Sequence, residues 1–332
     1  MTKILLAFII SFCVAVAVAP FVIWFMKKQK AKQTILHYVE AHAKKQGTPT
    51  MGGIIFLFSL GIACACFLRG GSRLALVSLA VTLAYALLGF FDDFVKIKMK
   101  QNLGLRPYQK IIFQVIVATL IAVFVYLSPL VGTKIEIPFF HKSVDLKWGI
   151  IPFTIVVFLA CTNAVNLTDG LDGLASLTTF IYMIMFVALI LLGEFGTKTA
   201  INMGKGTEMY SLIIFGVAVA GGLLAFLCFN AYPAKIFMGD TGSMALGAAV
   251  ACIGIFSRSS LFIPLFGIMF VASALSVVIQ VAYYKKTKKR VFLMAPLHHH
   301  FEKKGIHETK IVAVYGIITL MVGLGTLLLE FL

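Results

Sequence analysis

Long stretches without a charged side chain are the feature that most limits how this sequence can fold. Five such stretches are residues 4–26, 74–91, 111–133, 209–234 and 259–284. About 20 apolar residues in a helix cross the roughly 30 Å hydrocarbon core of a bilayer. Only 13% of the residues are charged, against about 25% in soluble domains. The sequence therefore predicts an all-α polytopic membrane protein.

The apolar pattern predicts about ten membrane-spanning helices within one domain over residues 1–332. The predicted spans are residues 3–26, 52–68, 73–91, 109–127, 149–165, 174–193, 211–229, 242–257, 261–282 and 309–331. The first span is longer than the core of a signal peptide, and its basic cluster follows it rather than precedes it, which argues against cleavage. Residues 132–148 alternate apolar and polar side chains and predict a short β-hairpin outside the membrane.

The distribution of cations predicts the orientation of the chain. The net charge is +16, which would also suit nucleic-acid binding. However, the loops 27–50, 92–110, 230–241 and 283–310 carry 20 of the 29 Lys and Arg residues, and the opposite side carries nine. The positive-inside rule places the first set in the cytoplasm. Most of the basic excess is then topological, so we expect no nucleic-acid partner, and we infer no disulfide from the six cysteines, which all lie in apolar runs.

Carboxylates gather at the predicted cytoplasmic ends of the spans. Five of the six aspartates lie there, namely Asp92, Asp93, Asp169, Asp172 and Asp240. Ordinary polar residues at helix ends would be the simpler interpretation. Acids near bilayer depth cost a few kcal/mol, roughly, and therefore usually face a cavity or a partner. The grouping predicts a cleft that opens at the cytoplasmic face.

The pair Asp92 and Asp93 ends the predicted span 73–91 in "GFFDDFVK". Neighbouring side chains on a helix point about 100° apart, so the two carboxylates face different directions. Lys96 follows Asp92 by four residues and lies on the same helical stripe if the helix continues. A divalent cation or the lysine would offset the repulsion between the acids, and a simple salt bridge is the alternative.

Two further stretches combine acids with glycines. In "NAVNLTDGLDGLAS", Asp169 and Asp172 each precede a glycine, near Asn166 and without any cation. In "NAYPAKIFMGDTGSMALG", Asp240 precedes an apolar span. Asp172 and Asp240 also suit helix N-caps. The chemical interpretation of Asp240 is a magnesium ligand, because Mg²⁺ at phosphate sites takes one or two carboxylates. Phe237 suits either stacking on a base or the core.

Two basic segments complete the pattern. "APLHHHFEKKG" places three consecutive histidines in the interior of the chain. Adjacent side chains rarely converge on one metal, so a hydrogen-bonding or proton-handling role beside phosphate fits better. "HAKKQGTPTMGG" places two lysines before a Gly-Thr-Pro-Thr turn, which suits either a substrate phosphate or lipid head groups.

Taken together, "KQGTPTMGG", "GFFDDFVK", "NAVNLTDGLDGLA", "FMGDTGSMALG" and "PLHHHFEKKG" resemble the polyprenyl-phosphate N-acetylhexosamine-1-phosphate transferases. "PTMGG" and "HHHFE" are similar to one branch in particular, the phospho-N-acetylmuramoyl-pentapeptide transferase (MraY) family. The resemblance runs from Lys45 to the last helix.

The resemblance implies a reaction. Phospho-MurNAc-pentapeptide would move from UDP-MurNAc-pentapeptide to undecaprenyl phosphate, giving lipid I and UMP, the first membrane step of peptidoglycan synthesis. It also implies Mg²⁺ as cofactor, a homodimer, and a multi-pass location in the bacterial cytoplasmic membrane, with the active site on the cytoplasmic face.

The resemblance assigns roles to individual residues. Asp240 matches the magnesium ligand, with Asp93 close to the metal, and Asp92 matches the proposed general base. The catalytic set it implies is Lys45, Asp92, Asp93, Lys96, Lys110, Asp240 and His298. The substrate-binding set it implies is Asn166, Asp169, Gly170, Leu171, Asp172, Asn230, Phe237, His299 and His300.

Three other functions suit parts of the pattern. A sister enzyme that transfers GlcNAc-1-phosphate would share the acidic motifs but not the histidine triplet. A transporter would place acids near mid-span, often in paired half-repeats, and neither is seen here. A scaffold or lipid-binding protein would not need five aspartates at the membrane boundary.

Overall fold

The computed structural model describes residues 1–29, 47–68, 70–99, 104–196 and 205–332. The helices are α1 (Thr2–Lys28), α2 (Gly53–Phe67), α3 (Arg73–Met99), α4 (Pro107–Leu127), α5 (Ile150–Thr168), α6 (Leu174–Gly196), α7 (Lys205–Asn230), α8 (Gly239–Phe256), α9 (Ile263–Phe266), α10 (Ile268–Thr287), α11 (Leu297–Lys303) and α12 (Glu308–Phe331). Among the described residues, nine helices are long and apolar enough to cross a membrane, and α2 is an apolar helix of 15 residues. The predicted all-α polytopic fold with about ten spans is confirmed.

Helix α8 forms the centre of the bundle. Every residue from Thr241 to Phe256 is buried, and α8 packs along α3 and α5. Its sequence is rich in glycine and alanine, which lets neighbouring backbones approach closely in a membrane protein. Helices α1, α4 and α12 instead expose many large apolar side chains on their outer faces, as lipid-facing helices do.

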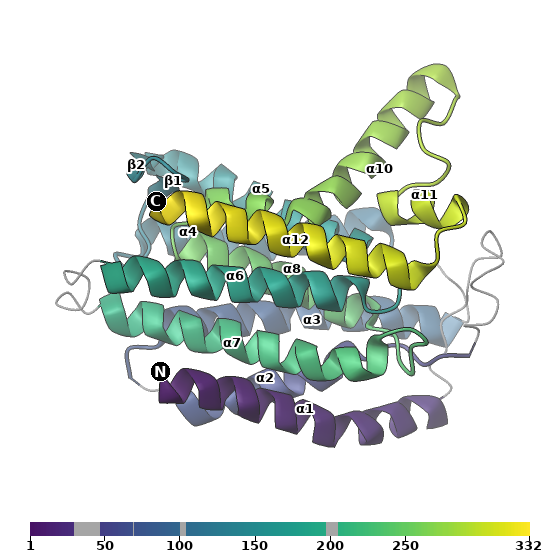
Figure 1. Cartoon of the computed structure of the whole chain (residues 1–332), viewed down its shortest axis with the longest axis horizontal. Helices are drawn as coiled ribbons and strands as arrows, with labels where there is room; N and C mark the ends of the chain where they lie inside the picture. The colour runs from purple at the N-terminus through teal and green to yellow at the C-terminus, as the bar shows by residue number, and fades with distance from the viewer. Residues whose placement is uncertain (30–46, 69, 100–103, 197–204) are drawn as a thin grey trace.

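The two ends of the bundle differ in character. The N-terminus, the C-terminus and the hairpin of β1 (Lys134–Ile137) and β2 (Lys142–Asp145) lie at one end, and α11 lies at the other (Figure 1). The strands pair antiparallel, with Lys134 opposite Asp145. The predicted hairpin is confirmed, and it shares an end with both termini, as the charge distribution predicts. The assignment of that end to the outside of the cell stays a prediction.

Two predicted spans differ from the structure, one in where it ends and one in its continuity. The span predicted to end at residue 91 continues as α3 to Met99, so Asp92 and Asp93 lie within a helix rather than at its end. The span predicted over residues 261–282 is interrupted, because the chain bends at Gly267 between α9 and α10. Pro264 lies in the first turn of α9, where proline is tolerated. From this bend, α10 leaves the bundle at an angle (Figure 1).

Candidate active site

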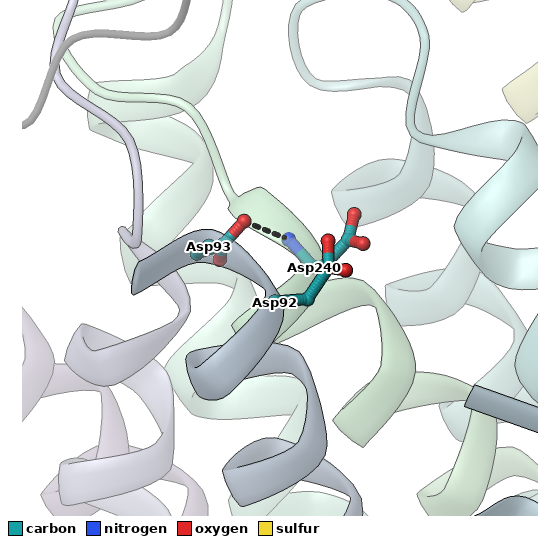
Figure 2. Close-up of side chains that lie close together, drawn as sticks. All are labelled: Asp92, Asp93 and Asp240. Atoms are coloured by element: carbon teal, nitrogen blue, oxygen red, sulfur yellow. Dashed lines mark hydrogen bonds between the residues drawn. The ribbon is translucent and has the colours of Figure 1, made fainter. Parts of the chain in front are cut away.

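Three carboxylates meet at the end of the bundle that faces away from the hairpin. Asp92 and Asp93 come from α3 and Asp240 comes from the first turn of α8 (Figure 2). One oxygen from each lies within 4.8 Å of the other two. Asp92 and Asp93 are buried, whereas the Asp240 side chain keeps 17% of its surface exposed. Such a set of carboxylate oxygens suits a hard divalent cation.

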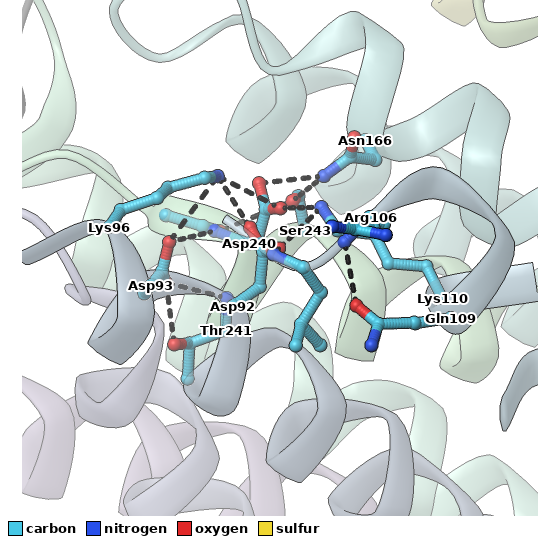
Figure 3. Close-up of polar contacts among 12 residues, drawn as sticks. Asp92, Asp93, Lys96, Arg106, Gln109, Lys110, Asn166, Asp240, Thr241 and Ser243 are labelled. Carbon is cyan, nitrogen blue, oxygen red and sulfur yellow. Dashed lines mark hydrogen bonds and ion pairs between the residues drawn. The ribbon is translucent and has the colours of Figure 1, made fainter. Parts of the chain in front are cut away.

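Two lysines bridge Asp92 and Asp240 (Figure 3). Lys96 Nζ lies 2.6 Å from Asp92 Oδ2 and 3.1 Å from Asp240 Oδ2. Lys110 Nζ lies 3.0 Å from Asp92 Oδ1 and 2.6 Å from Asp240 Oδ2. Because α3 continues past the acids, Lys96 sits one turn beyond Asp92 on the same face. The two lysines offset the charge of the buried acids and present cations beside them.

Asp93 holds the start of α8. Its Oδ1 accepts a hydrogen bond from the Asp240 backbone N–H at 3.1 Å, and its Oδ2 accepts from the Thr241 N–H at 2.9 Å and the Thr241 hydroxyl at 2.7 Å. These donors are among the N–H groups that a helix leaves unsatisfied at its start. Gly239 precedes them with φ +75°, and a Cβ there would lie 2.6 Å from Asp93 Oδ2, so only glycine fits.

The N-cap interpretation of Asp240 is wrong. The N-cap position of α8 is Met238, and Asp240 lies inside the helix. Because Asp93 supplies the capping contacts from another helix, the Asp240 side chain is free to face Lys96 and Lys110.

Asn166 approaches Asp240 from the last turn of α5. Its Nδ2 donates to Asp240 Oδ1 at 3.1 Å and to Ser243 Oγ at 2.9 Å. The sequence reasoning did not select Thr241 or Ser243. Both follow Asp240 within one helical turn, and that spacing was the available signal.

Asp92 lies beneath the chain that leads into α4. Leu105 N–H donates to Asp92 Oδ1 at 2.7 Å, and a Cβ on Gly104 would lie 2.3 Å from the same oxygen. Helix α4 then begins with Pro107, and the Gln109 side chain accepts from the Arg106 N–H at 2.9 Å. This start places Lys110 in the first turn, beside Asp92. No pattern in the sequence indicated the contact made by Gly104 and Leu105.

A polar layer lies about one helical turn deeper in the bundle. Asn163 Nδ2 donates to Gln114 Oε1 at 2.9 Å, and the Tyr85 hydroxyl donates to the Gln114 backbone carbonyl at 3.1 Å. Gln114 follows Lys110 by four residues and Asn163 precedes Asn166 by three. The layer joins the helices that carry the site. Sequence reasoning missed it, although polar side chains within apolar spans were a signal.

The turn between α5 and α6 forms a second group of predicted site residues. Asp169 is half-buried. Burial raises its pKa to about 8, and the carboxylates of Asp240, Asp93 and Asp172 act in the same direction while Lys96 opposes them. Asp172 Oδ2 accepts from the Ala234 N–H at 3.0 Å. The electrostatic influence of Asp240 on Asp169 connects this turn to the carboxylate cluster.

The glycine and leucine of this turn lie against other elements. A Cβ on Gly170 would lie 2.2 Å from His298 Nε2 and 3.0 Å from His299 Nε2, so the turn packs directly on α11. Leu171 is buried in a small apolar cluster with Met269 and Tyr315. In this structure Leu171 is thus a packing residue of the turn.

Asn230 is the last residue of α7, and Phe237 lies in the segment that connects α7 to α8. Asn230 Oδ1 accepts from the Gly173 N–H at 3.2 Å and the Ser176 hydroxyl at 2.8 Å, and its Nδ2 donates to the Ile236 carbonyl at 3.0 Å. Buried Asn230 therefore ties the turn after α5 to this segment. Phe237 is partly buried and pairs through its backbone with Pro49 and Gly52.

The three histidines face different surroundings. His298 is fully buried against Gly170. His299 Nδ1 lies 2.9 Å from Glu302 Oε2. His300 Nδ1 accepts from the Leu293 N–H at 3.1 Å. Desolvation and, to a lesser extent, Lys304 lower the pKa of His300. The triplet does not converge on one point, as expected for adjacent residues, and only His298 and His299 face the turn at Gly170. The remaining predicted residue, Lys45, lies outside the described residues.

Comparison with known proteins identifies a consistent set of relatives. The sequence profile described as glycosyl transferase family 4 matches residues 74–258. The profile described as phospho-N-acetylmuramoyl-pentapeptide-transferase signature 1 matches residues 45–57. Proteins named phospho-N-acetylmuramoyl-pentapeptide-transferase are 41% identical in Clostridium novyi (strain NT), over 97% of this chain and 95% of the relative, and 43% identical in Clostridium perfringens (strain 13 / Type A), over 96% of each. A relative of the same name in Clostridium kluyveri is 42% identical over 97% of each chain.

Proposed function

Because the chain belongs to the phospho-N-acetylmuramoyl-pentapeptide transferases within glycosyl transferase family 4, we propose that it transfers phospho-MurNAc-pentapeptide from UDP-MurNAc-pentapeptide to undecaprenyl phosphate. The products are lipid I and UMP. In this reaction an oxygen of the acceptor phosphate forms a bond to the sugar-linked phosphorus of the donor, and the bond from that phosphorus to the UMP oxygen breaks.

The observation that carries the proposal is the convergence of Asp92, Asp240, Lys96 and Lys110 at one end of the bundle. Donor diphosphate and acceptor phosphate are both anionic, and phosphoryl transfer depends mainly on positioning and on charge neutralisation. Lys96 and Lys110 supply the positive charge next to the acids. A cluster at the end of membrane helices is within reach of a lipid phosphate and of a soluble nucleotide.

The carboxylate cluster fits Mg²⁺. Asp240 is the preferred ligand because its side chain keeps exposed surface beside the two lysines. Asp93 lies within reach of the same ion, but both of its oxygens already accept hydrogen bonds from α8, so its role as second ligand stays a prediction. When bound, the cation would neutralise charge that develops on the phosphate oxygens.

Asp92 is the proposed general base. It accepts the proton of the lipid phosphate when that phosphate is monoprotonated, and Lys96 and Lys110 stabilise the resulting anion. Asp92 is fully buried beneath Gly104 and Leu105. Contact with the acceptor therefore requires this segment to move. His298 faces the Gly170 turn and is proposed to support the donor there, beside His299.

The membrane setting follows from the same proposal. We propose a multi-pass location in the bacterial cytoplasmic membrane with the cluster at the cytoplasmic face, supported by the cation excess in the loops at that end. Cysteine labelling at Ser143, in β2, tests the orientation: labelling from outside is expected, and labelling only from inside would reverse it. A homodimer stays a prediction from the resemblance.

The decisive experiment is UMP release by the purified protein with UDP-MurNAc-pentapeptide, undecaprenyl phosphate and Mg²⁺. We expect turnover by the wild type and none by Asp240→Asn, with an unchanged melting temperature. UDP-GlcNAc as the only donor tests the sister enzyme. Turnover with UDP-GlcNAc but not with the muramoyl donor would overturn the proposed substrate. Wild-type activity of Asp240→Asn would remove Asp240 from the site.

A further inference from the structure

The far end of α10 carries a dense group of cations outside the carboxylate cluster. Five of the six residues from 285 to 290 are basic: Lys285, Lys286, Lys288, Lys289 and Arg290. All five are exposed. Within the part of the chain that the structure describes, none of them lies in an ion pair with an acidic side chain. The group is thus available to an anionic partner.

The helix that carries this group is separated from the bundle. Helix α10 projects away from its neighbours, and its far end lies at the same end of the molecule as α11 (Figure 1). Its apolar side chains are exposed, for example Leu275 at 51% and Val278 at 61%. Tyr283 and Tyr284 follow, at 43% and 46% exposed. The order along the helix is therefore apolar, aromatic and basic.

This order matches the layers of a bilayer. Apolar side chains suit the hydrocarbon, tyrosines suit the interface, and cations next to a membrane helix attract anionic head groups. The positive-inside rule accounts for an excess of cations in cytoplasmic loops in general. It does not require five of them in six residues, next to two exposed tyrosines, on the helix that stands apart from the bundle.

The basic segment also has a defined shape. Lys288 has φ 57° and ends the helix. The chain then turns back, and the Gln280 side-chain oxygen accepts from the Val291 N–H at 3.1 Å and the Phe292 N–H at 2.9 Å. The bond from Leu293 N–H to His300 ties the segment to α11. The cations are therefore presented by an ordered turn rather than by a loose tail.

We propose that residues 283–290 form a binding surface for the anionic head groups of bulk phospholipids. The tyrosines lie at the level of the glycerol region and the cations contact the phosphates. Since the turn is bonded to α11, lipid bound here also fixes the element that carries His298. The surface is independent of the proposed reaction, because it needs neither the donor nor the lipid acceptor.

The test measures lipid selectivity by electron paramagnetic resonance. The full-length protein is reconstituted in phosphatidylcholine vesicles that contain spin-labelled phosphatidylglycerol or spin-labelled phosphatidylcholine, with no substrate present. The motionally restricted fraction of each label gives the preference for the anionic lipid. We expect the wild type to prefer phosphatidylglycerol, and the preference to fall as salt rises, because salt screens exposed charges.

The variant K285Q/K286Q/K289Q should lower this preference at least about threefold, given the attraction of each cation to an anionic surface. The matched control is K134Q/K142Q/K147Q, which removes the same charge from exposed lysines at the hairpin end and should leave most of the preference. An equal fall in both variants would indicate a general charge effect and overturn the proposal. No preference in the wild type, or no fall in the first variant, would also overturn it. UMP release by the same wild-type preparation tests the proposed function separately.

Discussion

The contact between Gly104 and Asp92 gives the sharpest test of the site geometry. A Cβ at residue 104 would lie 2.3 Å from Asp92 Oδ1 and 2.6 Å from its Cγ. The carboxylate cannot easily rotate away, because Lys96, Lys110 and the Leu105 N–H all hold it. Gly104→Ala must therefore shift either the carboxylate or the chain that leads into α4.

The structure sets the size of the effect. A displaced carboxylate lengthens its ion pair with Lys110 from 3.0 Å, and this pair is proposed to stabilise Asp92 during the reaction. A hydrogen bond to a charged group contributes about 1.5–3 kcal/mol. Each 1.36 kcal/mol or so of lost transition-state stabilisation is a factor of about ten in rate. We expect kcat/KM for UMP release to fall about 10- to 100-fold.

The matched control is Gly61→Ala in α2, where a Cβ would meet no atom within 4 Å. This variant should keep the wild-type rate, since alanine is also the better helix former. Thermal unfolding of both variants shows whether Gly104→Ala remains folded. If folded Gly104→Ala kept the wild-type kcat/KM, the segment over Asp92 would have no part in catalysis and the reasoning would be refuted.

Three further predictions concern other parts of the molecule. His298→Ala should lower the rate of UMP release at least about 100-fold, as loss of an acid–base or charge-stabilising group does, whereas His141→Ala at the hairpin end should not; equal rates would return α11 to a structural role. Glu208→Ala should lower the melting temperature, because the buried Glu208 carboxylate accepts from the Leu74 N–H at 2.9 Å at the start of α3, and Glu208→Gln, which keeps an acceptor, should restore most of it. Because burial raises the pKa of Asp169 from 3.8 to about 8, the folded state binds an extra proton between these values, so stability should fall as pH rises towards 8. Asp169→Asn, measured in EDTA, should flatten this slope, and an unchanged slope would contradict the raised pKa.

The sequence predicted the features that depend on composition along the chain. The apolar runs indicated the spans, the alternation at 132–148 indicated the hairpin, and the position of Asp240 before a span placed it at one end of the bundle. The predicted end of the span at residue 91 was wrong because hydropathy drops at Asp92 while helix α3 continues to Met99. Lys96 lies one turn later and compensates the acid, so the charged turn stays helical. Charged residues near the membrane boundary are tolerated when they pair with each other. A hydropathy profile scores each residue separately and therefore does not detect such pairs.

The contacts that build the site could not be predicted, because they join residues far apart in the sequence. The cover over Asp92 depends on a backbone N–H, and every residue except proline carries one, so no side-chain pattern marks it. Likewise the link between Asn163 and Gln114 depends on how α4 packs against α5. A polar residue in an apolar span indicates that some partner exists but does not identify it.

The two adjacent aspartates differ in what they face, and this difference changes how their variants should be interpreted. Asp93 accepts three hydrogen bonds from the start of α8, including one from the backbone of Asp240 itself, so it fixes where Asp240 lies. Asp92, about 100° around the helix, faces the lysines. Loss of activity in an Asp93 variant would therefore follow from a displaced Asp240, even if Asp93 never contacted a metal. Only a direct measurement of Mn²⁺ affinity separates the two roles. An Asp93→Asn variant that still binds Mn²⁺ but turns over slowly would show that Asp93 positions α8, and loss of binding with an intact α8 would show that it is a ligand.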